Sequence, residues 1–289
     1  MLKKIITNVI FVLFSTTGIC CASELTANND APQKNLKPDP VDTVLEQLNE
    51  KTSELKSYKC RIEYKYIQKL LESESLHKGV LYYSRTGEKS ALRINFDTLK
   101  QEDEDEQKYM EQYLVLDGSR LTGSDYEFEG IWLVHLDYEG EEARYYQLAE
   151  PNDPNETFDV FDLASRNLPM LGFSKINDLK KEFDVKLIEQ KEDDSEDFIQ
   201  VRLDVKPNSI YKDEYISIDF WVDKKSGLPA KVVAVTTEPE PPMGDVCEIK
   251  FLKPEINKNI DSRVFEFRIP DSFSEPEIIP IEKDNERVQ

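Results

Sequence analysis

The stretch Tyr215–Val235, YISIDFWVDKKSGLPAKVVAV, predicts a β-hairpin. Its first half is rich in β-branched and aromatic residues, and its side chains alternate between two faces, Ile216, Ile218, Phe220 and Val222 against Tyr215, Ser217, Asp219 and Trp221. Asp223–Gly227 supplies turn residues and ends in a glycine that can adopt a positive φ. Pro229 has no backbone N–H, so we expect it at the beginning of the return strand. One face of the hairpin is aliphatic, and a sheet of such hairpins has an apolar side.

Further segments with a two-residue alternation predict that the hairpin belongs to a large antiparallel sheet. The clearest is Tyr58–Gln68, in which Cys60, Ile62, Tyr64 and Tyr66 alternate with charged residues. Turn signals separate it from other expected strands at 77–84, 91–96, 113–116, 130–138, 143–148, 185–189, 198–205, 247–252 and 264–269, with one more starting at Leu121. We therefore expect about ten or eleven strands in one strongly curved sheet, because a twisted sheet of that size curls.

Helical spacing appears before the sheet and after its first half. Apolar residues recur at this spacing from Val41 to about Lys56, and a very apolar segment, Phe158–Gly172, follows two prolines. Ile176–Phe183 is a second helical segment in this insertion. The expected fold class is mainly antiparallel β (α+β). The curved sheet would form an incomplete β-barrel, and the N-terminal helix and one or two inserted helices would cover its concave mouth.

The first 22 residues have the order of a secretory signal peptide. Lys3 and Lys4 precede an apolar run, Ile5–Phe14, and small residues follow it. We expect cleavage after Ala22 or Ser23 and a periplasmic mature protein. Lipid anchoring at Cys20 or Cys21 is the less favoured alternative, because a lipoprotein signal needs a small residue just before its cysteine. The expected organisation is a signal peptide at 1–22, a flexible linker at 23–40, one domain at 41–281 and a loose tail at 282–289.

The charge of the chain excludes one class of partner. Its 58 acidic and 37 basic residues give a net charge of −21, and loss of the two lysines in the signal peptide makes it −23. Because such a chain repels phosphate backbones, we expect no nucleic acid partner.

Two cysteines, Cys60 and Cys247, remain in the mature chain. In an exported protein they are a candidate disulfide, and two buried free thiols are the alternative.

The sequence contains no recognisable catalytic or metal-binding motif. His77 and His135 each lie in a strand pattern and are expected to be packing or surface residues rather than a ligand pair. We find no zinc motif, phosphate loop, dinucleotide fingerprint or serine elbow. The acidic run Gln101–Gln107 does not follow the spacing of a calcium loop, so a solvated hairpin end is favoured over a calcium site. We therefore expect no enzymatic activity, no cofactor and no metal.

The order of these features resembles the LolA family of periplasmic outer-membrane lipoprotein carriers and LolA-like lipoprotein-sorting proteins. The resemblance covers roughly Val41–Ile279 and rests on an N-terminal helix, two apolar helices within the insertion, and five quoted segments: GVLYYSR at 79–85, LVLDGSRL at 114–121, VKP at 205–207, FWVDKKSGLPAKV at 220–232 and VFEFRIP at 264–270. The family's functional arginine corresponds to Arg85, although Thr86 stands where the family has proline. The aromatic residue that the family carries after the Asp-Gly turn is also absent, since Thr122 follows Leu121.

The resemblance implies a half-open barrel lidded by helices that carries the acyl chains of lipoproteins, or another lipid, towards the outer membrane. It also implies an inner-membrane lipoprotein-releasing transporter and an outer-membrane acceptor as partners of a monomer. Arg85 is expected to hold the lid by donating hydrogen bonds to backbone carbonyls. The candidate residues of the lid and cavity are Arg85, Leu92, Phe96, Trp132, Phe158, Phe161, Leu168, Leu171, Phe220 and Trp221.

Three alternatives stay open. The aromatic residues could fill an ordinary core, and Arg85 could end a strand at the surface. The same fold could serve as a lipid- or lipoprotein-sensing regulatory module of the cell envelope. A secreted hydrolase that uses His77 or His135 is the least favoured function.

Overall fold

The computed structural model describes residues 39–87, 89–121, 126–150, 176–189, 196–237 and 244–281. The predicted signal peptide, most of the linker, the apolar segment around Phe158–Gly172 and the C-terminal tail lie outside these residues. Among the described helices, none is long and apolar enough to cross a membrane.

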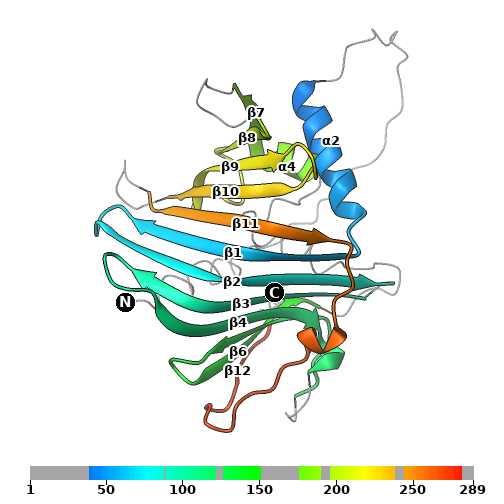
Figure 1. Cartoon of the computed structure of the whole chain (residues 1–289). Coiled ribbons are helices and arrows are strands. Elements are labelled where there is room, and N and C mark those ends of the chain that lie inside the picture. The colour runs from blue at the N-terminus through cyan, green and yellow to red at the C-terminus, as the bar shows by residue number, and fades with distance from the viewer. Residues whose placement is uncertain are drawn as a thin grey trace, which may run out of the picture.

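The described part of the chain forms one twelve-stranded sheet in the order β12-β6-β5-β4-β3-β2-β1-β11-β10-β9-β8-β7. All neighbouring strands are antiparallel except the short β12, which is parallel to β6. Figure 1 shows the strands stacked from β7 at the top to β12 at the bottom. The two edges are not paired with each other, so the sheet is an incomplete barrel and the predicted fold class is confirmed. The strands are β1 (Ser57–Gln68), β2 (Ser73–Thr86), β3 (Lys89–Gln101), β4 (Gln107–Asp117), β5 (Ile131–Asp137), β6 (Glu142–Ala149), β7 (Phe183–Ile188), β8 (Phe198–Val205), β9 (Tyr215–Asp223), β10 (Pro229–Thr236), β11 (Val246–Ile256) and β12 (Glu277–Ile279).

The hairpin predicted from Tyr215–Val235 is confirmed as β9 and β10, with Pro229 at the start of β10 and Gly227 at φ +69°. The predicted division of its faces is wrong at one end. The register between β9 and β10 shifts between Val235 and Thr236, so Ile216 turns outward and is 47% exposed. Tyr215 therefore joins the apolar face together with Ile218.

Two short helices lie at the β7 end of the sheet. Helix α2 (Pro40–Ser53) begins with Pro40 at its first position, and the side chain of Asp39 accepts a hydrogen bond from the backbone N–H of Val41. Its buried residues are Val44, Leu45 and Leu48, as its apolar spacing predicts. Helix α4 (Ile176–Glu182) packs against α2 and β7. Figure 1 shows α2 beside the upper strands of the sheet.

Each face of the sheet has its own hydrophobic core. The larger core lies on the face that α2 and α4 cover, which we call the inner face, and it takes side chains from β1 to β11. The smaller core lies on the opposite, outer face of β4, β5 and β6. These three strands are therefore buried on both sides, and β5 begins with an apolar run from Ile131 to Val134.

The segment at 264–269 does not form the predicted strand. Its first two residues end a short 3₁₀ helix, η4 (Ser262–Phe265), which the side chain of Asp261 caps by accepting a hydrogen bond from the backbone N–H of Arg263. Phe267 and Ile269 then pack on the outer core. This segment thus covers the outer face of the sheet, and only the short β12 after it joins the sheet, beside β6. A 3₁₀ turn, η2 (Gly118–Arg120), precedes Leu121, and the strand expected to start there stays a prediction, because the next residues, 122–125, lie outside the described part.

Candidate functional site

The candidate site is the inner face of the sheet, because its buried apolar side chains form one cluster that reaches from β6 to β7. Eleven strands, β1 to β11, contribute aromatic or aliphatic side chains, among them Ile62, Leu81, Leu92, Phe96, Val115, Leu133, Tyr146, Leu203, Phe220, Val232 and Phe251. The described helices pack on this face near β7. This face is apolar along most of its extent.

The predicted cavity residues separate into two groups in the structure. Leu92, Phe96 and Phe220 lie together in the inner cluster. Trp132 lies on the outer face, fully buried, where its ring meets Phe128 at a centroid distance of 5.1 Å. Trp221 is half-buried on the outer side of β9, with the ammonium of Lys231 4.4 Å from its ring centroid. The two tryptophans are thus separated from the apolar inner surface. Phe158, Phe161, Leu168 and Leu171 lie outside the described residues.

Arg85 connects the sheet to the end of helix α2. Its guanidinium donates a hydrogen bond to the backbone carbonyl of Ser53, the last residue of the helix. Its backbone N–H donates to the carbonyl of Lys56 at 2.8 Å. A positive charge at the C-terminus of a helix also interacts favourably with the helix dipole. Arg85 therefore does contact a backbone carbonyl, and the carbonyl belongs to the N-terminal helix.

Cys60 and Cys247 are both free and buried. They lie on the neighbouring strands β1 and β11, but Cys247 pairs with Tyr66, six residues along β1 from Cys60. At roughly 3.3 Å per residue this separates them by about 20 Å, far beyond the reach of a disulfide. The structure thus favours the interpretation as two thiols. Burial raises the pKa of each to about 12, which keeps both protonated and unreactive.

A polar group interrupts the apolar inner face at Glu111 of β4, which is 3% exposed. Its Oε1 accepts a hydrogen bond from the hydroxyl of Tyr113 at 2.7 Å and lies 2.7 Å from Nε2 of His135. The rings of Tyr113 and His135 stack at a centroid distance of 4.5 Å. Burial, followed by the charge of Glu111, raises the pKa of Tyr113 well above its usual value, so the phenol stays protonated as the donor.

His77 of β2 extends this polar cluster. It is 1% exposed, and its ring contacts those of Phe96 and Tyr109 at centroid distances of 5.5 and 5.3 Å. Burial lowers its pKa, partly opposed by the charge of Glu111, so the ring is neutral at neutral pH. Both histidines pack inside the protein, whereas the sequence left a buried and a surface position open. The described residues contain no group of three or more ligands that could hold a metal ion.

Glu111 was missing from the residues singled out in the sequence. The predicted strand began at Tyr113, and Glu111 then fell in the polar stretch before it. The sequence signal that could have identified Glu111 is its position two residues before Tyr113 and four before Val115, which places it on the same face of one strand.

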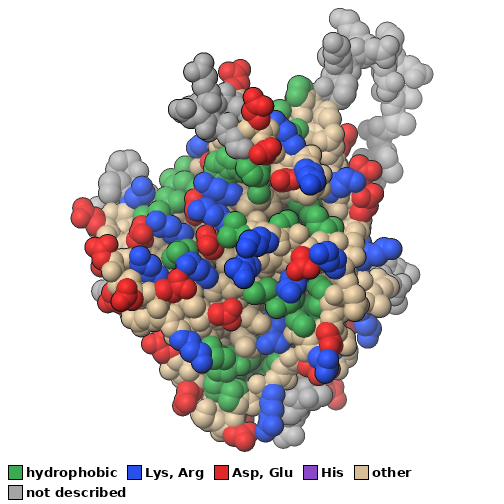
Figure 2. All heavy atoms as spheres, viewed as in Figure 1, with side chains coloured by type: hydrophobic (Ala, Val, Ile, Leu, Met, Phe, Trp, Pro, Cys, Tyr) green, Lys and Arg blue, Asp and Glu red, His purple; other side chains and the backbone are tan. Residues whose placement is uncertain are grey.

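The outer face is polar where the outer core does not cover it. Cross-strand ion pairs include Lys231 with Glu248 at 3.1 Å and Lys65 with Glu74 at 2.7 Å. Figure 2 shows basic and acidic side chains interspersed on the face in view. Such exposed pairs contribute little stability, but they keep this side of the sheet hydrated. The contrast between the two faces concentrates the apolar surface inside.

No protein-family model and no curated protein matches this chain. Several solved structures do match this chain. A LolA superfamily protein from Nitrosomonas europaea is 12% identical, with a TM-score of 0.31, over 78% of this chain and 97% of that one. An outer membrane lipoprotein-sorting protein domain from Vibrio parahaemolyticus is 11% identical, with a TM-score of 0.36, over 78% and 97%. The lipoprotein LppX from Mycobacterium tuberculosis is 9% identical, with a TM-score of 0.37, over 76% and 97%. The structural neighbours of this chain thus include LolA superfamily and lipoprotein-sorting proteins, the group that its sequence resembles.

Proposed function

We propose that this protein is a periplasmic carrier that binds the acyl chains of lipoproteins, or another lipid, on its inner face and transfers them towards the outer membrane. The observation that carries the proposal is the continuous apolar inner surface, which spans the sheet from β6 to β7. A binding function of this kind requires no catalytic group.

The energetics of an acyl chain fit such a surface. Burial of each CH₂ contributes about 0.8 kcal/mol, so a chain of roughly 16 carbons gains on the order of 10 kcal/mol when it leaves water. A carrier must also release its cargo, and an element that moves between open and closed positions lowers the affinity when it opens.

We assign the roles of the described candidates within this proposal. Leu92, Phe96 and Phe220 would contact the hydrocarbon, since they lie together in the inner cluster. Arg85 would hold α2 against the sheet through the carbonyl of Ser53, so that α2 is the covering element it controls. The two tryptophans, which lie on the outer face, would not contact the cargo.

The proposal is tested by the ligand that the protein retains. The full chain is expressed with export, purified without detergent and analysed by native mass spectrometry and by mass spectrometry of an organic extract. We expect a bound acylated molecule at close to one per protein, replaceable by palmitoylated peptide. Purified protein that contains no bound ligand and does not bind the palmitoylated peptide would exclude the carrier function.

A further inference from the structure

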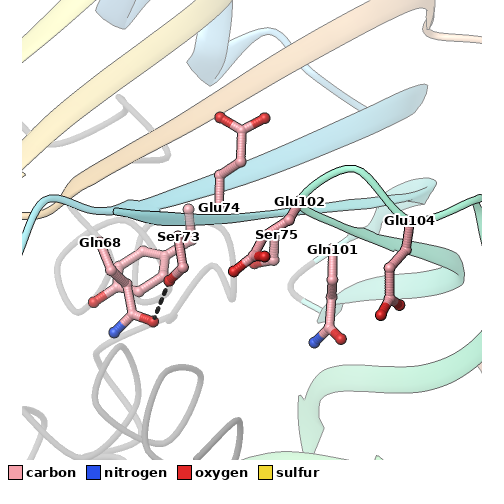
Figure 3. A pocket seen from close by; sticks show the side chains of 8 residues that line it. Gln68, Ser73, Glu74, Ser75, Gln101, Glu102 and Glu104 are labelled. Carbon is pink, nitrogen blue, oxygen red and sulfur yellow. Dashed lines mark hydrogen bonds between the residues drawn. The ribbon is translucent and has the colours of Figure 1, made fainter. Parts of the chain in front are cut away.

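A pocket of about 230 Å³ lies at the end of the sheet where the hairpin of β1 and β2 meets the turn after β3 (Figure 3). Ser75 on β2 is its central residue, because it pairs with Tyr66 of β1 on one side and with Gln101 of β3 on the other. The lining is otherwise polar and acidic, and consists of Tyr66, Gln68, Ser73, Glu74, Ser75, Gln101, Glu102 and Glu104. Three different strands and one turn therefore meet at this pocket.

The hydroxyl of Ser75 is a buried polar group that could bind a ligand. Ser75 is 7% exposed, and its Oγ has no hydrogen-bond partner among the residues that the structure describes. Figure 3 shows its side chain on the same side of the strands as those of Gln68 and Gln101. A buried hydroxyl without a partner is unfavourable, so a polar group that enters the pocket and bonds to Oγ would gain binding energy there.

The charge of the lining selects the sign of that group. Glu74, Glu102 and Glu104 line the pocket, and within the described part of the chain no lysine or arginine does. Lys65 lies 2.7 Å from Glu74 and offsets one carboxylate. Two carboxylates remain without a basic neighbour in the lining, so a cation is favoured and a phosphate or carboxylate is repelled. An ammonium group suits these partners, because its three N–H donors match hydroxyl, amide and carboxylate oxygens.

The pocket also adjoins the apolar inner face. His77 follows Ser75 by two residues and therefore projects from the same side of β2, and its ring lies 6.0 Å from that of Tyr64 in the inner cluster. A molecule with a polar end at Ser75 can thus place its hydrocarbon on the inner surface.

We propose that this pocket binds a primary ammonium group. The proposal rests on the proposed function in one respect, since it takes the ammonium to be the polar end of an amphiphile whose hydrocarbon lies on the inner face. The structure thereby assigns the cargo a chemical class, an amine-bearing lipid.

The test compares three ligands with the same chain of twelve carbons, dodecylamine, dodecan-1-ol and dodecanoate, each kept below its aggregation concentration. Each competes with an apolar fluorescent probe for the full chain at pH 7. We expect dodecylamine to bind about tenfold tighter than dodecan-1-ol, as two partly exposed carboxylates acting on one ammonium would give, and dodecanoate to bind more weakly than both. Raising the salt concentration should reduce the preference. Ethylamine serves as the free amine without a tail and should compete poorly.

Two sets of variants locate the effect. The double variant Glu102→Gln and Glu104→Gln should reduce the preference for the amine over the alcohol to about twofold or less. Its matched control, Asp103→Asn and Asp105→Asn, removes two charges from the same turn at residues that do not line the pocket, and should keep the preference. Ser75→Ala should weaken amine binding about threefold without lowering the melting temperature, because it removes a buried hydroxyl that has no partner.

Each result bears on one proposal. Equal binding of amine and alcohol, or equal loss in the pocket variant and its control, would overturn the ammonium site and leave the carrier function standing. Binding of ethylamine as tight as that of dodecylamine would show a site for free amines and contradict the lipid assignment. Failure of all three long-chain ligands to compete would refute the carrier function, and the lipid assignment with it.

Discussion

Gly79 is a position where the fold leaves no room for a side chain. A Cβ at this residue would lie 1.8 Å from the backbone oxygen of Asn95 on β3, beside the register shift between β2 and β3. Gly79→Ala must therefore separate the two strands, and we expect a loss of roughly 2–4 kcal/mol in the free energy of unfolding. Urea denaturation measures this loss.

Gly87 provides the control for that substitution. It has a φ of +62°, and a Cβ there would meet nothing within 4 Å. Gly87→Asn, which tolerates this conformation, should change the stability by less than about 1 kcal/mol. Equal stability of the Gly79→Ala variant and the parent chain would contradict the close approach of β2 and β3.

His77 should make the protein less stable in mild acid. Burial lowers its pKa below the value of 6.5 that it takes when unfolded, so the unfolded chain binds the proton at a higher pH than the folded chain does. The contribution of the neutral ring is complete above pH 6.5 and is lost as the pH falls through the folded pKa, with a slope of at most about 1.4 kcal/mol per pH unit. The other titratable groups packed around it are Glu111, Tyr109 and Tyr64.

His77→Phe removes this titration while it keeps an aromatic ring in the same place. We expect the free energy of unfolding of the variant to fall less steeply between pH 7 and pH 5 than that of the parent chain. Chemical denaturation across this range measures both slopes. Equal slopes for the variant and the parent chain would mean that the pKa of His77 is the same in the folded and unfolded states.

At the scale of elements, Arg85 is the contact by which β2 holds the C-terminal end of α2. Arg85→Met keeps the length of the side chain but removes its donors, so the last turn of α2 should open more often. We expect backbone amide exchange in residues 50–57 to become about tenfold faster, the loss of roughly one charged hydrogen bond. Arg61→Met on the exposed side of β1 is the control. Unchanged exchange in residues 50–57 would argue against any role of Arg85 in holding α2.

Arg93 holds the segment after β11 against the sheet. Its Nη1 donates to the carbonyls of Val264 at 2.7 Å and Glu266 at 2.8 Å, and so fastens the covering segment to the outer side of β3. Arg93→Met should expose residues 262–273 to limited proteolysis and cost roughly 2 kcal/mol of stability. Protease resistance equal to that of the parent chain would show that Phe267 and Ile269 hold the segment without Arg93.

The sequence predicts those elements whose signal is local. The hairpin of β9 and β10 is one, because alternation and turn chemistry at Asp223–Gly227 act within neighbouring residues. The outward turn of Ile216 was not predictable, since it depends on the register with β10. The faces of β5 were not predictable either, because Trp132 and Leu133 belong to different cores and both are buried.

The segment at 264–269 is a whole element that local sequence patterns could not assign correctly. Its alternating apolar residues suit an edge strand, and they suit equally well a covering segment that lies on an apolar face. The segment covers the sheet, and does not pair as a strand, because it packs on the outer core of β4, β5 and β6. No local pattern in the sequence predicts that core. Of the candidate site, Leu92, Phe96 and Phe220 were named from the family resemblance, and alternation placed Phe220 on the aliphatic face of its hairpin. Glu111 and the pocket at Ser75 were not, because both arise from residues of several strands.

At the scale of the whole molecule, the account depends on the two faces having different tasks. The outer face carries charged pairs, a smaller apolar core and a covering segment, whereas the inner face carries the larger apolar cluster, which reaches from β6 to β7. A hydrocarbon guest must therefore contact residues of the inner cluster and avoid those of the outer core.

Photochemical labelling tests this claim most directly. The full chain is incubated with palmitate that carries a diazirine near the end of its tail, irradiated, digested and mapped by tandem mass spectrometry. We predict labels on inner residues of β3 and β9, at or next to Leu92, Phe96 and Phe220, that disappear when unlabelled palmitoylated peptide is added. Labels confined to the outer face around Trp132 and Phe267, or no competable label at all, would contradict the account.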